Sequence, residues 1–329
     1  MHRLDLCRPP FCTGKQHYLN GCSFDDVWAN PEEYIEWIKP RLEEFQRILK
    51  PTGSIYIHCD WHISHYLKVL SDSIFGRRNF LNEIIWKRQS SHNDAKQGGR
   101  HFGRIHDTVL YYAGSQKYIW NQQYIPYDEI YVERTYKYVE SVTERRYALG
   151  DLTAPGGPTK GNPHYEFLGV KRYWRYSKVK MHQLFTVGKI VHKKGKVPLL
   201  KRYLDEMFGK PVQDIWTDIS LNCKKGKRFP TQKPEAFLER IISTSSNPEH
   251  IVYEPFAGSA TGAVVCQKLS RRWIGSELSE NTCNFAVDRL NAMGCNLKLY
   301  PKGEISSKAE FDAAMDIARF VLENNQCQQ

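Results

Sequence analysis

Apolar residues recur along the first 120 residues at spacings that alternate between helical and strand periods. Helical spacing predicts a helix that begins at Asn30-Pro31, and the internal Pro40 should kink or split it. Further along, the pattern predicts a strand over 54–58, a helix over about 62–75, an apolar strand over 80–86 and a strand over 108–112. This rhythm is typical of an α/β sheet. The apolar positions of the first helix are Tyr34, Ile35, Ile38, Leu42, Phe45 and Leu49.

The alternation of helical and strand spacing is absent between residues 120 and 229, where Pro and Gly are frequent. Only two helical pieces are predicted there, around 127–146 and 199–208. The polar, Gly-bearing segment 89–104 is predicted to be a loop near the active face. We therefore expect a sheet domain in two halves, 1–119 and 230–329, with an inserted region over 120–229.

The pattern resumes with a helix that starts at Pro234-Glu235 and leads into the apolar strand 251–253. That strand ends in Glu254 and breaks into a turn of small residues, and a second helix follows. Another strand, over 272–276, ends in Glu277. In a doubly wound α/β sheet, ligands bind beyond the carboxyl ends of the parallel strands, where small residues allow close approach. We expect both acids to line a pocket there.

The turn after Glu254 lacks the marks of the common phosphate sites. It has neither Gly-Lys-Ser/Thr nor the three glycines of a dinucleotide fingerprint. Two carboxylates would repel a pyrophosphate, but they suit a ligand with a cationic amine and a ribose, such as S-adenosylmethionine. An ordinary strand, turn and helix without a ligand is the alternative at this point.

Composition places the chain among globular proteins. It has 329 residues, of which 41% are hydrophobic and 25% charged, and no apolar run approaches the length of about 20 residues that spans a bilayer. The N-terminus does not have the pattern of a signal peptide, and the nine cysteines form no Cys-x-x-Cys pair, which predicts reduced thiols and a cytoplasmic protein. His58 and Cys59 should point to opposite faces of a strand, so no metal site is predicted.

Basic charge is concentrated in one segment. Residues 160–229 hold 17 Lys and Arg against 5 Asp and Glu, whereas the rest of the chain holds 30 against 31. Aromatic residues alternate with the charges, which favours nucleic-acid binding; a solvated basic surface is the alternative, and the aromatics could equally form the core of the insert. The candidate DNA-binding residues are Lys171, Arg172, Tyr173, Trp174, Arg175, Lys178, Lys180, Lys224, Lys225, Lys227 and Arg228.

Four motifs, in this order, resemble those of the β-group of DNA amino-methyltransferases. They are Pro-Pro-Phe-Cys-Thr-Gly at 9–14, Phe-Pro-Thr-Gln-Lys-Pro-Glu at 229–235, Glu-Pro-Phe-Ala-Gly-Ser-Ala-Thr at 254–261 and Trp-Ile-Gly-Ser-Glu at 273–277. The resemblance covers essentially the whole chain. It implies a doubly wound, mostly parallel, Rossmann-like methyltransferase sheet with an inserted target-recognition region. It also implies methyl transfer from S-adenosylmethionine to adenine N6 or cytosine N4 of double-stranded DNA, on a base flipped into the pocket.

The resemblance gives each motif position an expected role. Glu254 would face the methionine amine, where the family usually has Asp, and Glu277 would hold the ribose hydroxyls. Thr231 and Lys233 would lie near the methionine carboxylate, with Gln232 between them. The cofactor turn would comprise Pro255, Phe256, Gly258, Ser259 and Thr261, with Ala260 where Gly is commoner. The catalytic motif would comprise Arg8, Pro9, Pro10 and Phe11.

The catalytic motif departs from the family at Arg8, where relatives have Asp, Asn or Ser. That polar side chain and the next Pro carbonyl normally accept the two protons of the target amine. Arginine has five donors and no acceptor, so only the Pro9 carbonyl and the Phe11 ring remain for the base. Only Met1–Leu6 precede Cys7, and we expect the first part of that strand and the contacts to the cofactor's adenine to be missing.

We interpret the chain as an adenine-N6 DNA methyltransferase, because the motif ends in Pro-Pro-Phe. The alternatives are a cytosine-N4 enzyme, a decayed or truncated member that keeps DNA binding, and an RNA methyltransferase. No membrane partner is expected, and a homodimer and a cognate restriction endonuclease stay open as partners.

Overall fold

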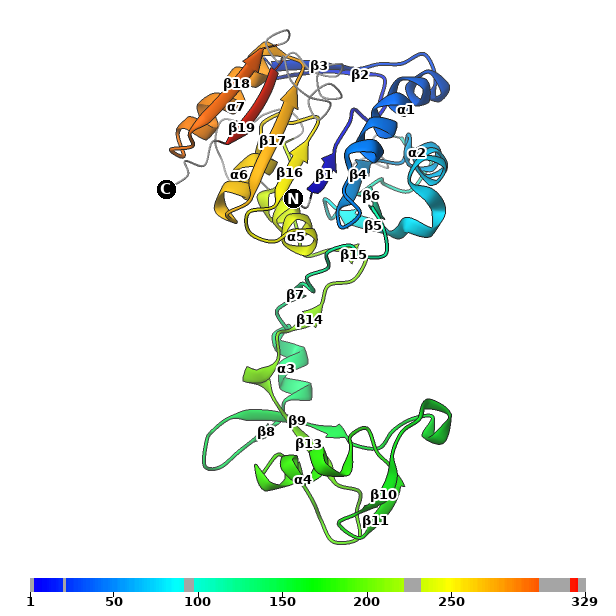
Figure 1. Cartoon of the computed structure of the whole chain (residues 1–329), viewed down its shortest axis with the longest axis vertical. Helices are drawn as coiled ribbons and strands as arrows, with labels where there is room; N and C mark the ends of the chain where they lie inside the picture. Colours follow the sequence, from blue (N-terminus) through cyan, green and yellow to red (C-terminus); the bar gives the residue numbers. More distant parts are fainter. Residues whose placement is uncertain (1–2, 20–21, 92–97, 222–231, 302–319, 325–329) are drawn as a thin grey trace. The chain divides into compact units, whose positions relative to one another are not determined.

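The computed structural model describes residues 3–19, 22–91, 98–221, 232–301 and 320–324, and these divide into two compact units (Figure 1). The larger unit comprises the described residues up to Gln123 and from Gln213 onward, and the smaller comprises Tyr124–Val212. The smaller unit is narrower than the expected insert 120–229, because residues 213–216 already return to the sheet of the larger unit. No helix among the described residues is both long and apolar enough to cross a membrane.

The larger unit is built on one sheet to which the described residues contribute nine strands. Strands β6 and β19 run antiparallel to their neighbours, and the other seven share one direction, so the predicted doubly wound, mostly parallel, Rossmann-like sheet is confirmed. In spatial order the strands are β15 (Ile215–Trp216), β5 (Phe80–Lys87), β6 (His106–Ala113), β4 (Ser54–Cys59), β1 (Arg3–Cys7), β16 (Ile251–Glu254), β17 (Arg272–Glu277), β19 (Phe320–Asn324) and β18 (Leu297–Pro301).

The direction in which the chain moves across this sheet reverses between β1 and β16. From β1 it passes through α1 (Pro31–Ile48) to β4 on one side, and from β16 through α6 (Thr261–Lys268) to β17 on the other. Right-handed crossovers in opposite directions place α1 and α6 on opposite faces of the sheet. The gap beyond the carboxyl ends of β1 and β16 is therefore the topological switch point, where such sheets bind ligands.

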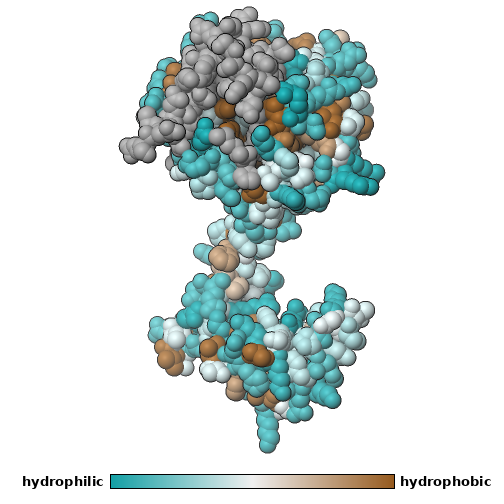
Figure 2. Space-filling model, in the orientation of Figure 1, coloured by the Kyte–Doolittle hydropathy of each residue, from teal (hydrophilic) through white to brown (hydrophobic). Residues whose placement is uncertain are grey.

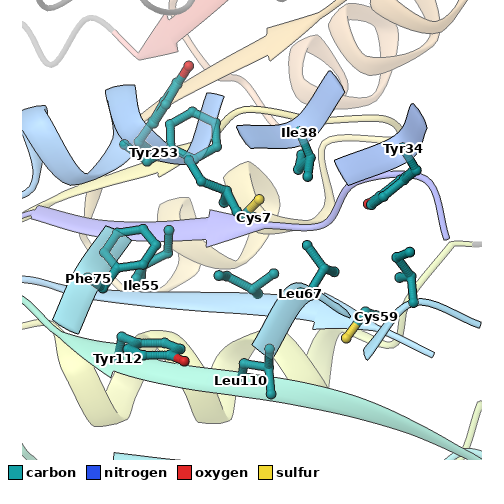
Figure 3. Packing of buried hydrophobic residues seen from close by; sticks show 14 of the residues in the cluster. Cys7, Tyr34, Ile38, Ile55, Cys59, Leu67, Phe75, Leu110, Tyr112 and Tyr253 are labelled. Carbon is teal, nitrogen blue, oxygen red and sulfur yellow. The ribbon is translucent and has the colours of Figure 1, made fainter. Parts of the chain in front are cut away.

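The main apolar core lies between the sheet and the helices α1 and α2 (Ser64–Ser71). In Figure 3, Tyr34 and Ile38 of α1 point toward Cys7 of β1, while Leu110 and Tyr112 of β6 line the same cluster. All of these side chains are buried. On the other face, α5 (Glu235–Ser245) packs against α6, and α7 (Glu280–Asn291) follows β17. The core thus packs against β1 as far as Cys7, the residue before Arg8.

The first helix is not split at Pro40, which was one of the two outcomes predicted for it. It is a single helix over Pro31–Ile48, with Pro40 inside it rather than at a break. The Asn30 side chain accepts a hydrogen bond of 2.8 Å from the Glu33 N–H, and the Arg41 guanidinium donates to the Trp37 carbonyl in the turn beside Pro40. Burial of the apolar face keeps the helix continuous although Pro40 has no N–H for the Glu36 carbonyl.

The smaller unit carries a sheet of order β12-β13-β9-β8 and differs most from the sequence pattern. The segment predicted as helical over 199–208 is strand β13 (Leu199–Tyr203), which pairs along its length with β9 (Arg146–Asp151), so that prediction is wrong. Of the piece predicted over 127–146, only α3 (Glu129–Thr135) is helical. Pairing between distant segments outweighs local propensity here. The remaining elements are β7 (Tyr124–Ile125), β8 (Tyr138–Val139), β10 (His164–Phe167), β11 (Val170–Tyr173), α4 (Lys178–Thr186), β12 (Ile190–Val191) and β14 (Lys210–Pro211).

Candidate active site

The two motifs that carry the predicted chemistry meet at the switch point. Strands β1 and β16 are parallel neighbours with Asp5 opposite Tyr253, so Arg8 and Glu254 both lie at the same edge of the sheet. The Arg8 Nη2 donates to Glu254 Oε1, and the two side chains retain only 13% and 4% of their exposure. The sequence placed these residues in separate roles and gave no signal that they form a buried ion pair.

The Glu254 carboxylate is closely confined on its other side. Its Oε2 is buried and accepts no hydrogen bond from the residues that the structure describes. A Cβ on Gly262, in the first turn of α6, would lie 2.4 Å from that oxygen. Only glycine therefore leaves room for the acid. One oxygen is thus occupied by Arg8, and the second is an acceptor directed at the start of a helix, where partial positive charge favours an anion.

The turn after Glu254 is tied to the rest of the sheet by hydrogen bonds. The Ala257 N–H donates to the Ser276 carbonyl at 2.9 Å, and the Ser276 hydroxyl donates to the Pro255 carbonyl at 2.8 Å. Phe256 is half-buried, with its ring 6.1 Å from that of Trp37. Ala260 has φ of 54°, a left-handed conformation that normally favours glycine. The turn conformation predicted from small residues is therefore kept even though Ala stands at this position.

Ser259 and Thr261, predicted to line the cofactor turn, are buried beneath it. Their hydroxyls are 2.9 Å apart. The Arg289 guanidinium of α7 donates to the Ser259 carbonyl and to the Thr261 hydroxyl, both at 2.9 Å. These contacts show that the two side chains brace the turn. Arg289 was missed from the sequence because nothing local relates it to residues 28 to 30 positions earlier.

Glu277 closes the other side of the turn. Its carboxylate accepts from the Gly258 N–H at 2.9 Å, the Leu278 N–H at 2.8 Å and the Ser279 N–H at 3.0 Å. Burial raises the pKa of Glu277, and these backbone donors act in the opposite direction. The second acid thus ties the end of β17 to the turn that follows β16, a structural role that the sequence did not indicate.

Phe11 lies beside a buried polar cluster made of His58, Asp107 and Lys233. Its ring is 5.2 Å from that of His58, in a T-shaped arrangement, and the Lys233 Nζ is 5.2 Å from its centroid. His58 and Asp107 are joined by a hydrogen bond of 3.1 Å, and Lys233 and Arg88 lie 3.7 and 3.1 Å from the Asp107 carboxylate. Lys233 thus faces Asp107, a partner that the motif did not indicate.

Burial sets the charge states in this cluster. It lowers the pKa of His58 to about 4 despite the hydrogen bond to Asp107, so the imidazole is neutral at pH 7 and donates from Nε2. Burial acts to raise the pKa of Asp107, but the hydrogen bond from His58 and the charge of Lys233 hold it at about 2. Burial also lowers the pKa of Lys233. The cluster is therefore one carboxylate shared by a neutral imidazole and two cations.

The Pro-Pro-Phe segment is held in place by two residues for which the sequence did not indicate this contact. The Tyr34 hydroxyl, buried on α1, donates to the Pro10 carbonyl at 2.8 Å. Asp26, which ends β3 (Cys22–Asp26), accepts from the Cys12 N–H at 2.6 Å and from the Thr13 hydroxyl at 2.5 Å. Strand β3 pairs with β2 (Lys15–Leu19) in a hairpin directly after the motif. The segment after Phe11 is thus anchored on both sides.

The candidate DNA-binding residues of the smaller unit divide into exposed basic residues and more buried aromatic residues. Lys171, Arg172, Arg175, Lys178 and Lys180 are exposed on β11, on α4 and between them. Trp174 is fully buried with Leu152, Phe167 and Met181, and its indole N–H donates to the Tyr165 carbonyl at 2.8 Å, so it belongs to the core and cannot stack on a base. Tyr173 is half-buried. The visible face of this unit is predominantly hydrophilic (Figure 2).

Five predicted site residues lie outside the described residues: Thr231 and the basic residues Lys224, Lys225, Lys227 and Arg228. Gln232 precedes Lys233 at the start of the described segment. Within that described part, no group of three or more His, Cys, Asp or Glu side chains could hold a metal ion.

Comparison with known proteins identifies the family. The DNA methylase family N6_N4_Mtase matches residues 4–288, and the chain belongs to it. The chain is 30% identical over 279 residues to the type II methyltransferase M.EcaI of Enterobacter cloacae, an alignment that covers 82% of this chain and 60% of that protein. It is 26% identical over 284 residues to the DNA adenine methyltransferase YhdJ of Escherichia coli, covering 86% and 74%.

A further relative and a solved structure are also similar to this chain. The match to the StyLTI Mod subunit, from a type III restriction-modification enzyme of Salmonella typhimurium, is 27% identical and covers 74% of this chain and 38% of that subunit. The chain thus spans less than two thirds of M.EcaI and well under half of StyLTI Mod. Among solved structures, the M1.HpyAVI–SAM complex is similar with 15% identity and a TM-score of 0.47, covering 88% of each chain.

Proposed function

We propose that this protein is a DNA methyltransferase that transfers a methyl group from S-adenosylmethionine to the exocyclic amine of adenine. The observation that supports this most is the contact of Glu254 with Arg8, the residue directly before Pro9-Pro10-Phe11, at the switch point between β1 and β16. A cofactor site and a base site on adjacent strand ends would bring the two reactants together. Membership of the DNA methylase family supports the same reaction class.

The cofactor's role is to supply an electrophilic methyl group, and residues around the turn would hold it. Glu254 has a buried acceptor oxygen without a described donor, which suits the methionine ammonium. Glu277 would accept from the ribose hydroxyls, and Phe256 would pack against the cofactor. Thr231 and Lys233, with Gln232 between them, would lie near the methionine carboxylate, the Lys233 charge being shared with Asp107. The residues present therefore fit the cofactor, except that Arg8 already occupies one oxygen of Glu254.

The base would bind beside Phe11. Its ring would stack on the adenine, and the Pro9 carbonyl would accept one amine proton. Arg8 cannot accept the other, so the position that activates the amine in relatives lacks an acceptor here. Because the amine is out of reach inside a duplex, we propose that the base is flipped into the site.

The smaller unit would bind the duplex as the target-recognition region. Its exposed cations Lys171, Arg172, Arg175, Lys178 and Lys180 would contact phosphates, with Tyr173 at their edge. Lys224, Lys225, Lys227 and Arg228 would extend this basic set. We place the protein in the cytoplasm with its DNA. The restriction-modification relatives support a cognate endonuclease as partner, and a homodimer is a further proposal.

Adenine is favoured over cytosine because the motif ends in Pro-Pro-Phe and because YhdJ is named a DNA adenine methyltransferase. Cytosine-N4 transfer is the second candidate, since the family includes both reactions. A third candidate is a protein that binds DNA with little methyl transfer, and the Arg8–Glu254 ion pair is the observation that favours it.

The test is to incubate the protein with labelled S-adenosylmethionine and unmethylated DNA, and to identify the methylated nucleoside by mass spectrometry. N6-methyladenine that disappears in Phe11→Ala supports the main proposal, and N4-methylcytosine supports the second. Unmodified DNA combined with tight, salt-sensitive DNA binding supports the third. A protein that binds neither DNA nor the cofactor contradicts all three.

A further inference from the structure

We propose that Arg8 is a built-in competitor of the cofactor, occupying the carboxylate of Glu254 that would otherwise receive the cofactor's ammonium group. This inference rests on the proposed function, because it assumes that Glu254 is the ammonium site. It adds a role for Arg8 that goes beyond the loss of a proton acceptor.

The position of the ion pair is the first argument. Arg8 is the first residue after β1 and Glu254 is the last residue of β16, and these adjacent strands flank the switch point. The pair therefore lies in the ligand site of the fold and not at a distant surface. Both side chains are largely buried, so water screens their attraction weakly.

Charge is the second argument. A guanidinium and an ammonium carry the same charge and are both donors only, so each needs the same acceptor. The Arg8 guanidinium already neutralises Glu254, and the positive charge of Arg289 also acts on Arg8. A cofactor ammonium at the open Oε2 of Glu254 would be repelled by the Arg8 guanidinium on Oε1. The ammonium therefore gains less from Glu254 while Arg8 is in place than after Arg8 has withdrawn.

The confinement of Glu254 decides which side chain moves. Gly262 lies so close to Glu254 Oε2 that a single added carbon would be 2.4 Å from it, and the acid is only 3% exposed. The carboxylate cannot turn away from Arg8 to serve a second cation elsewhere. Arg8, by contrast, has a long side chain with several rotatable bonds. The protein thus has two arrangements: one with Arg8 on Glu254, and one with Arg8 withdrawn and the acid available.

This arrangement predicts an unusual ligand preference. While Arg8 holds Glu254, a cofactor-like ligand gains little from its amine. When a neutral residue replaces Arg8, the buried acid is left without a cation, and the amine becomes a strong contributor. One charge-assisted hydrogen bond corresponds to a factor of about ten or more in affinity.

The experiment measures binding of S-adenosylhomocysteine, and of the same compound without its amino group, to the full chain by calorimetry. Wild type is compared with Arg8→Gln and with the charge-preserving control Arg8→Lys. We expect Arg8→Gln to bind S-adenosylhomocysteine about tenfold more tightly than wild type, with the gain lost for the deaminated compound. Arg8→Lys should stay within about threefold of wild type, because it keeps a cation on Glu254.

Several outcomes overturn the proposal. Weaker or unchanged binding by folded Arg8→Gln would mean that Arg8 assists the ligand or does not oppose it. If Arg8→Gln does not fold, wild type alone decides: an amine that improves its affinity by about tenfold or more contradicts occupancy of Glu254 by Arg8. Failure of the proposed function has a different signature, since neither compound would then bind any folded variant.

Discussion

His58 donates a hydrogen bond of 3.1 Å to Asp107 while its ring lies edge-on to Phe11, 5.2 Å away. The aromatic ring proposed to hold the base is therefore supported from behind by a buried imidazole. Because that imidazole is neutral in the folded protein, the support depends on pH.

Acid should weaken the fold through His58. Its pKa is about 4 when folded against 6.5 for the free side chain, so between these values the unfolded chain binds a proton that the folded chain does not. The free energy of unfolding thus keeps its full value above pH 6.5 and falls by about 3 kcal/mol as the pH drops to 4. Below that, protonation of Asp107, whose pKa is about 2, removes more. Urea unfolding at several pH values measures the slope, which His58→Gln should flatten. An equally steep dependence of stability on pH in His58→Gln would contradict this assignment. The control His101→Gln should show the same dependence as wild type.

Replacing Gly262 with alanine should damage the proposed cofactor site. The new Cβ would lie 2.4 Å from Glu254 Oε2 and force the carboxylate to move. In the Arg8→Gln background, we expect Gly262→Ala to lower affinity for S-adenosylhomocysteine about tenfold or more. Ala263→Gly is the control, because it removes a carbon in the same helix and should cost only about 1 kcal/mol of stability. Equal affinities for both variants would show that the Glu254 position is unimportant.

Tyr34 should act on the base site through the Pro10 carbonyl. Tyr34→Phe removes the hydrogen bond of 2.8 Å and leaves the partly buried Pro10 carbonyl without that donor, a loss of about 1 kcal/mol. Tyr34→Phe should also lower the affinity for DNA that contains the target base. The control is Tyr112→Phe, which removes a hydrogen bond of 2.8 Å to Asp72 on the far side of the core. A stability loss in both variants, with weaker DNA binding only in Tyr34→Phe, is the expected pattern. The same DNA affinity in both would count against this role.

The exposed cations of the smaller unit should contribute to DNA affinity through phosphates. Lys171→Ala and Arg172→Ala are each expected to weaken binding to all sequences and to reduce the slope of log K against log salt by roughly one. Fluorescence anisotropy at a series of salt concentrations measures this. Lys189→Ala removes the same charge in the same unit from a lysine already paired with Glu206 at 2.7 Å, and should change the slope less. Indistinguishable slopes for the three variants would argue against a defined phosphate-binding surface.

The sequence predicted the features that follow from local patterns. The strand ends carrying Glu254 and Glu277 and the turn between them are found where apolar runs and small residues indicated. It could not predict the Arg8–Glu254 pair, because the partners are 246 positions apart and meet only when β1 is inserted beside β16. Arg289 was missed because its partners lie 28 to 30 positions earlier. Asp26 was missed because the pairing of β2 with β3, which brings it to Cys12, was not predicted. Strand β13 was mistaken for a helix because its partner β9 lies about fifty residues earlier.

The central claim is that the switch point between β1 and β16 is a methyl-transfer site whose amine-activating position is filled by Arg8. The most direct measurement is methyl transfer from labelled S-adenosylmethionine to DNA by Arg8→Asn, which removes the cation and supplies a carbonyl acceptor. The account predicts more N6-methyladenine than wild type produces, and its loss when Phe11→Ala or Glu254→Gln is added. No gain in Arg8→Asn, or methylation that persists in those double variants, would contradict it.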